Sequence, residues 1–173
     1  LGFILRGIFL LQKHEVDWYV RGLRHVHPEA YDAFASIIPV EERDNIIAAY
    51  LRRLQDPDPQ VRQEATRRML VYELTCATTE GFKEEDLTAE TEARLATMPL
   101  LEAHYMTNNL PIPDSKYMDH VSRISHLPAI IVQGRYDMIC PIATAYDLHK
   151  NWPGSEFIVV ENAGHSAFEP SIR

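Results

Sequence analysis

Residues 129 to 160 constrain the fold most strongly, because strand and helix patterns alternate there. Ala129–Gln133 is a mainly apolar run, of the kind found in a parallel strand that is covered on both faces. Pro141 begins a helix that Pro153-Gly154 ends, and a second apolar run follows at Phe157–Val160. The segment is therefore predicted to form a strand-helix-strand unit with parallel strands. One face of its helix is expected to carry Ile142, Ala145, Tyr146, His149 and Trp152.

The rest of the chain divides into a short apolar start and a long polar, helical stretch. Residues 1–11 are predicted to be a further buried strand. Apolar residues at helical spacing predict a helix within Glu41–Leu54, and Asp58 is well placed to cap another that begins at Pro59. Pro99, Pro111 and Pro113 bracket a third around Glu102. The predicted layout is a strand over 1–11, a helical region over 12–113 and an α/β segment over 114–173.

Composition excludes several classes of protein. Of the 173 residues, 46% are hydrophobic and 24% charged, which is ordinary for a globular domain. The net charge is -8 and no basic run exceeds two residues, which disfavours nucleic-acid binding. The longest apolar stretch, 1–11, is broken by Arg6 and is shorter than the roughly 20 residues that span a bilayer. Two cysteines predict no disulfide scaffold, so a cytoplasmic location is expected.

Asp137 and His165 follow the two predicted strands of the strand-helix-strand unit. Because parallel strands end at the same edge of a sheet, both side chains are expected to face one crevice. A carboxylate beside an imidazole fixes its tautomer and leaves the second ring nitrogen to take a proton from a nucleophile. Either residue alone is more often structural. Together they fit the chain order of α/β-hydrolases, in which a serine precedes an acid and then a histidine.

Several segments resemble those of proline iminopeptidases, the prolyl aminopeptidases of the α/β-hydrolase superfamily. The segments are Leu5-Arg6-Gly7-Ile8-Phe9-Leu10, Val132-Gln133-Gly134-Arg135-Tyr136-Asp137, Cys140-Pro141 and Ala163-Gly164-His165-Ser166-Ala167-Phe168-Glu169-Pro170. The resemblance extends over the whole chain, including Tyr72-Glu73 and Glu102-Ala103-His104-Tyr105. It implies an α/β fold, with a partial α/β-hydrolase sheet and a helical cap domain. The implied enzyme removes an N-terminal proline from peptides, without a cofactor or a metal.

The resemblance also implies roles for individual residues. Asp137 and His165 would be two members of the catalytic triad, and Glu73 and Glu102 would bind the free amine of the substrate. Phe9 and Tyr19 would form the aromatic lining of the proline slot, next to the polar residue Arg6. Two positions depart from the family, because Met106 stands where an aromatic residue is usual and Tyr72 replaces the usual Trp. From spacing alone, both glutamates would be ordinary solvated helix residues.

The sequence offers no candidate for the nucleophilic serine. It contains no Gly-x-Ser-x-Gly, and none of its seven serines lies in a strand-turn-helix elbow. In the family that elbow precedes the Leu-Arg-Gly strand. We therefore expect the chain to be part of a longer protein and to be inactive alone. The edge of its first strand is expected to be exposed and to favour self-association.

Two other readings stay open at this point. The chain could belong to another capped α/β-hydrolase, acting on esters, amides or epoxides with the same acid and histidine, or it could be a truncated, non-catalytic interaction module. The paired glutamates favour a substrate that carries an amine. His25 and His27 lack further ligands at convincing metal spacing, and Cys140 is interpreted as a structural thiol.

Overall fold

The computed structural model describes residues 1–108 and 117–172, which form two compact units. The sheet unit comprises Leu1–Glu15, Ala77–Glu80 and Pro111–Arg173. The helical unit comprises Val16–Cys76 and Gly81–Leu110. Pro111 and Pro113, which were predicted to end a helix, and the predicted boundary at 113/114 lie outside the described residues. Each unit is described by itself.

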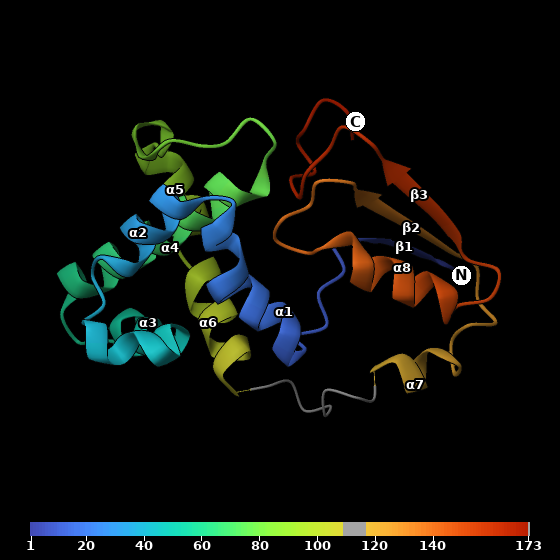
Figure 1. Ribbon diagram of the computed structural model, residues 1–173, viewed down its shortest axis with the longest axis horizontal. Coiled ribbons are helices and arrows are strands. Elements are labelled where there is room, and N and C mark those ends of the chain that lie inside the picture. Colours follow the sequence, from blue (N-terminus) through green and yellow to red (C-terminus); the bar gives the residue numbers. More distant parts are fainter. Residues whose placement is uncertain (109–116, 173) are drawn as a thin grey trace. The chain divides into compact units, whose positions relative to one another are not determined.

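The sheet unit contains three parallel strands in the order β1-β2-β3 (Figure 1). They are β1 (Phe3–Arg6), β2 (Ala129–Gly134) and β3 (Glu156–Val160). Helix α8 (Ile142–Lys150) connects β2 to β3, so the predicted strand-helix-strand unit is confirmed. A parallel pair requires such a crossover, which brings the carboxyl ends of β2 and β3 to one edge of the sheet.

One face of the sheet carries the core of this unit. Ile131 of β2 packs with Leu148 of α8 and with Trp152, whose indole nitrogen donates to the Leu127 carbonyl at 3.0 Å. Helix α7 (Tyr117–Val121) contributes Val121 to the same cluster. The predicted face of α8 is only partly right, because its buried residues are Thr144, Ala145 and Leu148. Tyr146 is 51% exposed and instead packs beside Phe157, with their ring centroids 5.9 Å apart.

The opposite face of the sheet is largely open among the described residues. Ile4 is 81% exposed and Ile158 is 39% exposed, and the side chains of Ile130 and Val132 are only half-buried. The prediction of strands covered on both faces is therefore wrong for this part of the chain. The predicted strand over 1–11 is also shorter, since only Phe3–Arg6 is a strand. Gly7 turns the backbone just after it with a φ of 59°.

Helices make up the second unit and the segment that leads into it. The α-helices are α1 (Lys13–Asp17), α2 (Pro28–Ala35), α3 (Ile46–Leu54), α4 (Pro59–Ala77), α5 (Ala89–Leu95) and α6 (Met98–Asn108). Shorter helical turns lie at Trp18–Gly22, Leu23–His25, Val40–Asn45 and Glu84–Asp86. The predicted cap of α4 is confirmed, because the Asp58 carboxylate accepts from the Gln60 backbone amide at 2.8 Å.

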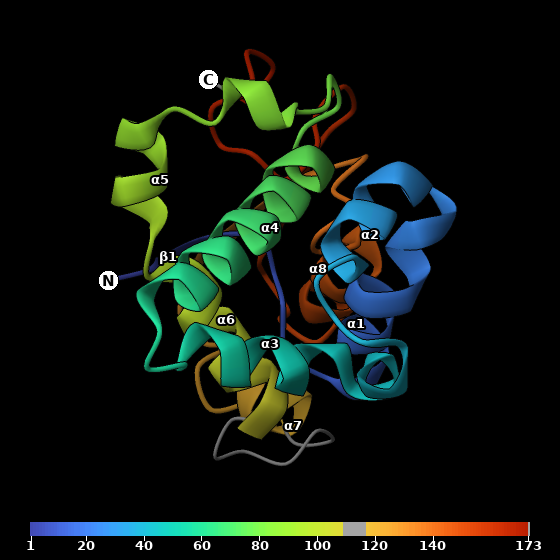
Figure 2. The same ribbon diagram turned by 90° about the vertical axis from the view of Figure 1, so that its left-hand side faces the viewer.

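An aromatic stack forms the core of the helical unit. The ring of Phe34 stacks on Tyr50 at 4.4 Å and on Tyr72 at 4.5 Å, measured between centroids. The Tyr50 hydroxyl donates to the Phe34 carbonyl at 2.5 Å, so the buried phenol is satisfied. Helix α3 packs against α6, as Figure 2 shows. These contacts fix α4 and α6, which carry the two glutamates of interest.

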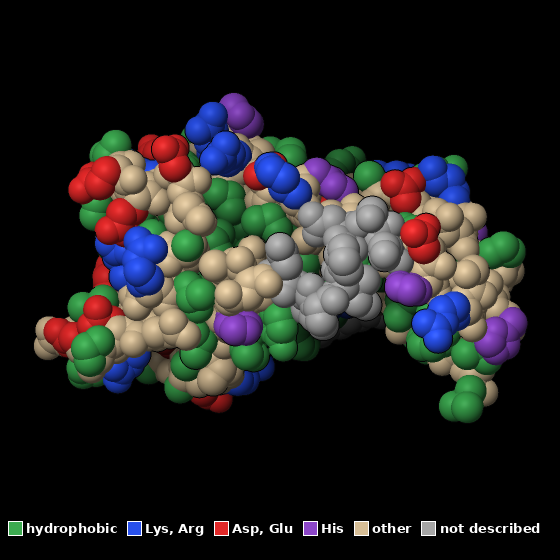
Figure 3. Space-filling model, turned by 90° about the horizontal axis from the view of Figure 1, so that it is seen from below, with side chains coloured by type: hydrophobic (Ala, Val, Ile, Leu, Met, Phe, Trp, Pro, Cys, Tyr) green, Lys and Arg blue, Asp and Glu red, His purple; other side chains and the backbone are tan. Residues whose placement is uncertain are grey.

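The surface shows no single-sign field on the side seen in Figure 3, where Lys and Arg side chains alternate with Asp and Glu. This distribution agrees with the absence of basic runs in the sequence. None of the helices in the described part of the chain is both long and apolar enough to cross a membrane.

Candidate functional site

Asp137 and His165 form a hydrogen-bonded pair at the carboxyl edge of the sheet. His165 Nδ1 donates to Asp137 Oδ2 at 3.0 Å. The same oxygen accepts from the Gln133 side-chain amide at 2.7 Å, and Oδ1 accepts from the Cys140 backbone amide at 2.7 Å. The Asp137 side chain is 2% exposed and that of His165 is 25% exposed. Three donors thus fix a buried carboxylate, which in turn orients an imidazole that is partly exposed to solvent.

Backbone contacts between the two loops set the separation of this dyad. The amides of Arg135 and Tyr136 donate to the carbonyls of Val160 and Ala163, at 3.0 and 2.9 Å. Gly134 lies where the loops cross, and a Cβ there would be 2.2 Å from the Gly164 carbonyl oxygen. Only glycine allows this approach, because real Cβ atoms do not come closer than about 3 Å to another heavy atom. The geometry therefore depends on backbone more than on side-chain packing.

The end of β1 supports the imidazole from a second side. The Arg6 guanidinium donates to the His165 carbonyl oxygen. Arg6 was predicted to be a polar residue of the substrate pocket. In the structure its side chain contacts the loop that carries His165. Gly7 follows, and a Cβ there would be 3.0 Å from Cε1 of His165. Both residues thus contribute to where the ring sits.

A second cluster lies in the helical unit and contains two carboxyl groups. Glu73, on α4, is buried, and Glu102, on α6, has an Oε2 atom that is fully enclosed and without a hydrogen-bond partner in the described residues. Burial, together with the charge of Glu73, raises the pKa of Glu102 to about 9. Glu102 therefore holds a proton at neutral pH. The prediction from spacing alone, that both glutamates are solvated, is wrong.

Tyr19 and Tyr72 complete this carboxyl cluster. Tyr19 is fully buried, and burial with the charges of Glu73 and Glu102 raises its pKa well above the ordinary value. The Tyr72 hydroxyl donates to the Tyr19 carbonyl at 2.8 Å, and the two rings meet edge to face. Met106 lies one helical turn after Glu102 on α6 and is half-buried. Of the predicted substrate-binding residues, Tyr19, Glu73, Glu102 and Met106 thus belong to the helical unit.

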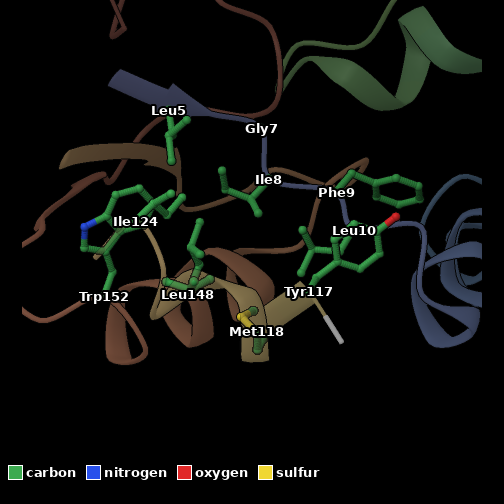
Figure 4. Close-up of a pocket in the computed structure, with 11 residues that line it drawn as sticks. Leu5, Gly7, Ile8, Phe9, Leu10, Tyr117, Met118, Ile124, Leu148 and Trp152 are labelled. Carbon is green, nitrogen blue, oxygen red and sulfur yellow. The ribbon is translucent and has the colours of Figure 1, made fainter. Parts of the chain in front are cut away.

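Arg6 and Phe9 belong instead to the sheet unit, with the dyad. Phe9 lies in the loop after β1 and lines an apolar pocket of about 350 Å³ (Figure 4). Leu5, Ile8, Tyr117, Leu148 and Trp152 are among the other residues that line this pocket. The predicted site residues therefore fall into two groups, one in each unit.

The described residues offer one group of three metal-ligating side chains. Ligand atoms of Asp137, Cys140 and His165 lie within 4.8 Å of one another. Both oxygens of Asp137 already accept hydrogen bonds, so a metal would have to displace the dyad's own contacts. Cys140 is buried and in no disulfide. The group fits the dyad chemistry better than a metal centre, which usually has four ligands.

One serine is hydrogen-bonded to a histidine, but at the other edge of the sheet. Ser155 Oγ lies 2.7 Å from His149 Nδ1. Ser155 precedes β3, whereas His165 follows it, so this pair lies at the amino end of the strand. It does not supply the dyad with a nucleophile.

Sequence reasoning missed two buried polar residues of the site. Gln133 is 1% exposed and binds both Asp137 and the Cys140 carbonyl. Its position within an otherwise apolar strand was a usable signal. Glu169 is 8% exposed and accepts from the Gly164 backbone amide at 3.1 Å. No local pattern marked Glu169.

Comparison with known proteins shows which proteins this chain is similar to. A family model described as TAP-like protein, of the α/β-hydrolase type, matches residues 93–172. The chain is 40% identical to proline iminopeptidase from Arabidopsis thaliana, over 99% of this chain and 46% of that protein. It is 39% identical to a probable proline iminopeptidase from Leptolyngbya boryana and 33% identical to proline iminopeptidase from Neisseria gonorrhoeae, each time over 99% of this chain and 54% of the relative.

The chain thus spans about half the length of the curated relatives it matches. The parallel sheet with its helical crossover agrees with a partial α/β-hydrolase sheet. By fold and by sequence, this chain is similar to α/β-hydrolases, and over nearly all of its length it is similar to proline iminopeptidases.

Proposed function

We propose that this chain supplies the base, the orienting acid and the amine-binding carboxyl groups of a serine-type aminopeptidase that releases N-terminal proline from peptides. The hydrolytic part of the proposal rests on the hydrogen bond from His165 to Asp137, a buried carboxylate that accepts hydrogen bonds from three donors. The proline iminopeptidase relatives and the buried carboxyl cluster support the choice of substrate.

In this mechanism, His165 acts first as a base and then as an acid. Its Nε2 takes the proton of a serine hydroxyl as the oxygen attacks the prolyl carbonyl, and then gives it to the departing amine. Asp137 keeps the proton of the ring on Nδ1 and stabilises the imidazolium that forms. The serine and the oxyanion donors are proposed to come from the part of the relatives' length that this chain does not cover.

Glu73 and Glu102 are proposed to bind the ammonium of the same N-terminal residue. An enclosed carboxyl oxygen without a hydrogen-bond partner in the described residues, such as Glu102 Oε2, is costly, and a cation placed beside it offsets that cost. The proton on Glu102 would leave as the ammonium enters, since an ion pair needs the carboxylate. A substrate with a blocked amine offers no such charge. Selectivity for free N-termini follows from this difference.

The test uses a chimera in which this chain is fused to the half of the Arabidopsis relative that it does not match. We expect hydrolysis of L-proline 4-nitroanilide but not of its N-acetyl derivative. Glu73→Gln and Glu102→Gln should each lower kcat/KM for the free amine by roughly 10- to 100-fold, because hydrogen bonds to charged groups contribute about 1.5–3 kcal/mol. Glu90→Gln, an exposed glutamate of the helical unit, is the matched control.

Three outcomes would contradict the proposal. Equal losses on free and blocked substrates would assign the glutamates to stability alone. Hydrolysis of simple esters without prolyl amides would indicate another α/β-hydrolase. Absence of any hydrolysis by a folded chimera would favour a non-catalytic module.

We also infer a cytoplasmic location and self-association, as the sequence predicted. Cys76 and Cys140 are both buried and in no disulfide, which suits a reducing compartment. β1 pairs with β2 alone in the described sheet and exposes Ile4, which supports pairing with a second copy. Sedimentation that changes with protein concentration would support association, and a monomer at all concentrations would contradict it.

A further inference from the structure

Glu169 lies buried beneath the loop that carries His165, and three donors meet on its carboxylate. Its Oε2 accepts from the Gly164 amide at 3.1 Å and from the Thr79 hydroxyl at 3.2 Å. Its Oε1 accepts from the Thr79 amide at 3.2 Å. One side chain therefore joins Gly164, the residue before His165, to Thr79, which lies 90 positions before Glu169 in the chain. All three residues belong to the sheet unit.

The same segment holds the histidine loop through its backbone. The Ala77 carbonyl accepts from the amides of both His165 and Ser166, each at 2.9 Å. Ala77 is the last residue of α4, and the last carbonyls of a helix have no partner within it. The end of α4 thus offers an acceptor that the loop uses twice. Gly164 fits tightly here, because a Cβ would lie 2.8 Å from Glu169 Oε1 and 3.1 Å from the Ala77 oxygen.

We propose that Glu169 is a positioning residue, which fastens the His165 loop to the end of α4 and thereby holds the imidazole in line with Asp137. The proposal deepens the proposed function, since it rests on His165 as the base. Asp137 fixes the ring through Nδ1, and Glu169 fixes the backbone from which the ring extends. Without the hydrogen bond from the Gly164 amide to Glu169, the loop could rotate about the hydrogen bond between His165 and Asp137. Glu169 itself touches no reacting group.

A carboxylate is required by the pattern of donors. The Gly164 amide faces one oxygen and the Thr79 amide faces the other, and neither donor can become an acceptor. In Glu169→Gln, the side-chain NH2 must face one of these N–H groups. The variant therefore keeps the volume of the side chain and breaks at least one of the three bonds. Thr79→Val removes only the hydroxyl donor, at a residue that is exposed and tolerant of change.

The experiment is performed on the chain itself by NMR, with 15N-labelled histidine and glycine. It follows the Nδ1 proton of His165 and the Gly164 amide proton. We expect Glu169→Gln to increase the exchange rate of the Nδ1 proton with water at least 10-fold and to move the Gly164 amide signal upfield. Thr79→Val should change both signals in the same direction but less. Glu161→Gln is the control, because Glu161 is exposed and its carboxylate pairs with the exposed Arg135 side chain rather than with the His165 loop backbone.

The outcomes separate this proposal from the proposed function. If Glu169→Gln lowers the melting temperature but leaves the Nδ1 proton unchanged, Glu169 is only structural and the proposal fails. If Glu169→Gln does not fold, an unchanged Nδ1 proton in Thr79→Val overturns the proposal and a faster exchange supports it. None of these measurements depends on peptide hydrolysis. In an active chimera, a fall in kcat with KM unchanged would give further support.

Discussion

The dyad and the carboxyl cluster are both buried acidic sites, yet they satisfy their charge in opposite ways. Asp137 accepts hydrogen bonds from three donors supplied by the protein. Glu102 has an enclosed oxygen without a hydrogen-bond partner in the described residues, and its pKa is raised to about 9. One carboxyl group is complete before substrate arrives. The other is assigned by the proposed function to the ammonium of the substrate.

This difference indicates which site is preorganised and which responds to a ligand. A charge-stabilising group works best when its partners are fixed in advance, since no reorganisation is then needed during reaction. A recognition group gains selectivity when it is unfavourable alone, because only the correct ligand removes the penalty. In the proposed function, the sheet unit therefore carries the preorganised acid and base, and the helical unit carries the amine-binding carboxyl groups.

Removing the charge of the preorganised site should have the largest effect. In the chimera, Asp137→Asn should lower kcat by about 10⁴-fold, as loss of the orienting acid does in other triads. The side-chain NH2 of the asparagine would also face one of the N–H donors whose hydrogen bonds the aspartate oxygens accept. Steady-state kinetics on L-proline 4-nitroanilide measure this, with exposed Asp119→Asn as control. Retention of more than a tenth of the parental kcat would show that the dyad is not the catalytic one.

Crowding the crossing of the two loops should come next. Gly134→Ala places a methyl group 2.2 Å from the Gly164 oxygen, so the histidine loop must shift. We expect a loss of about 1–3 kcal/mol in the free energy of unfolding, measured by urea denaturation, as for other overpacked sites. Gly154→Ala is the comparison, since a Cβ there meets nothing within 4 Å. The only cost of this substitution is the backbone strain of a φ of 86°. Equal losses for both variants would mean that backbone strain, not collision, sets the cost.

Titrating the conditional site should give the smallest effect, and its sign is distinctive. The raised pKa of Glu102 means that the folded protein keeps a proton which the unfolded chain releases above about pH 4.5. Its contribution to stability is therefore complete below pH 4.5 and falls as pH rises toward 9. Glu102→Gln should abolish this part of the pH dependence.

The measurement can be confined to the helical unit. The chain has two tryptophans, Trp18 in the helical unit and Trp152 in the sheet unit, so Trp152→Phe leaves Trp18 as the reporter. Urea unfolding of this variant from pH 5 to pH 9, with and without Glu102→Gln, gives the difference. Identical pH profiles for the two proteins would show that Glu102 is ionised in the folded state.

What the sequence predicted correctly was either local or fixed by topology. The Asp58 cap depends on residues two positions apart, and the strand-helix-strand unit depends on successive patterns. The pairing of Asp137 with His165 followed from the rule that neighbouring parallel strands end at one edge. Each inference needed either a short stretch of chain or a rule that holds for every such sheet.

The errors arose where distant residues decide the structure. The predicted strand over 1–11 stops at Arg6, and Glu15 then accepts from the amides of Leu10 and Gln12 and from the Thr144 hydroxyl. On α8, two apolar stripes were available, and only contact with the sheet selects Ala145 and Leu148 over Tyr146. Neither outcome is encoded in the local spacing.

The crossing of the two loops at Gly134 has a consequence for protein engineering. Amide and carbonyl groups hold the loops together, and the Arg135 side chain adds an ion pair across the junction to Glu161, at 2.9 Å. Tyr136 contributes its backbone amide, while its side chain is 52% exposed beside the edge that carries the dyad. Position 136 can therefore be varied to any residue except proline in a library that searches for new substrates, while the backbone bonds that align Asp137 with His165 are kept.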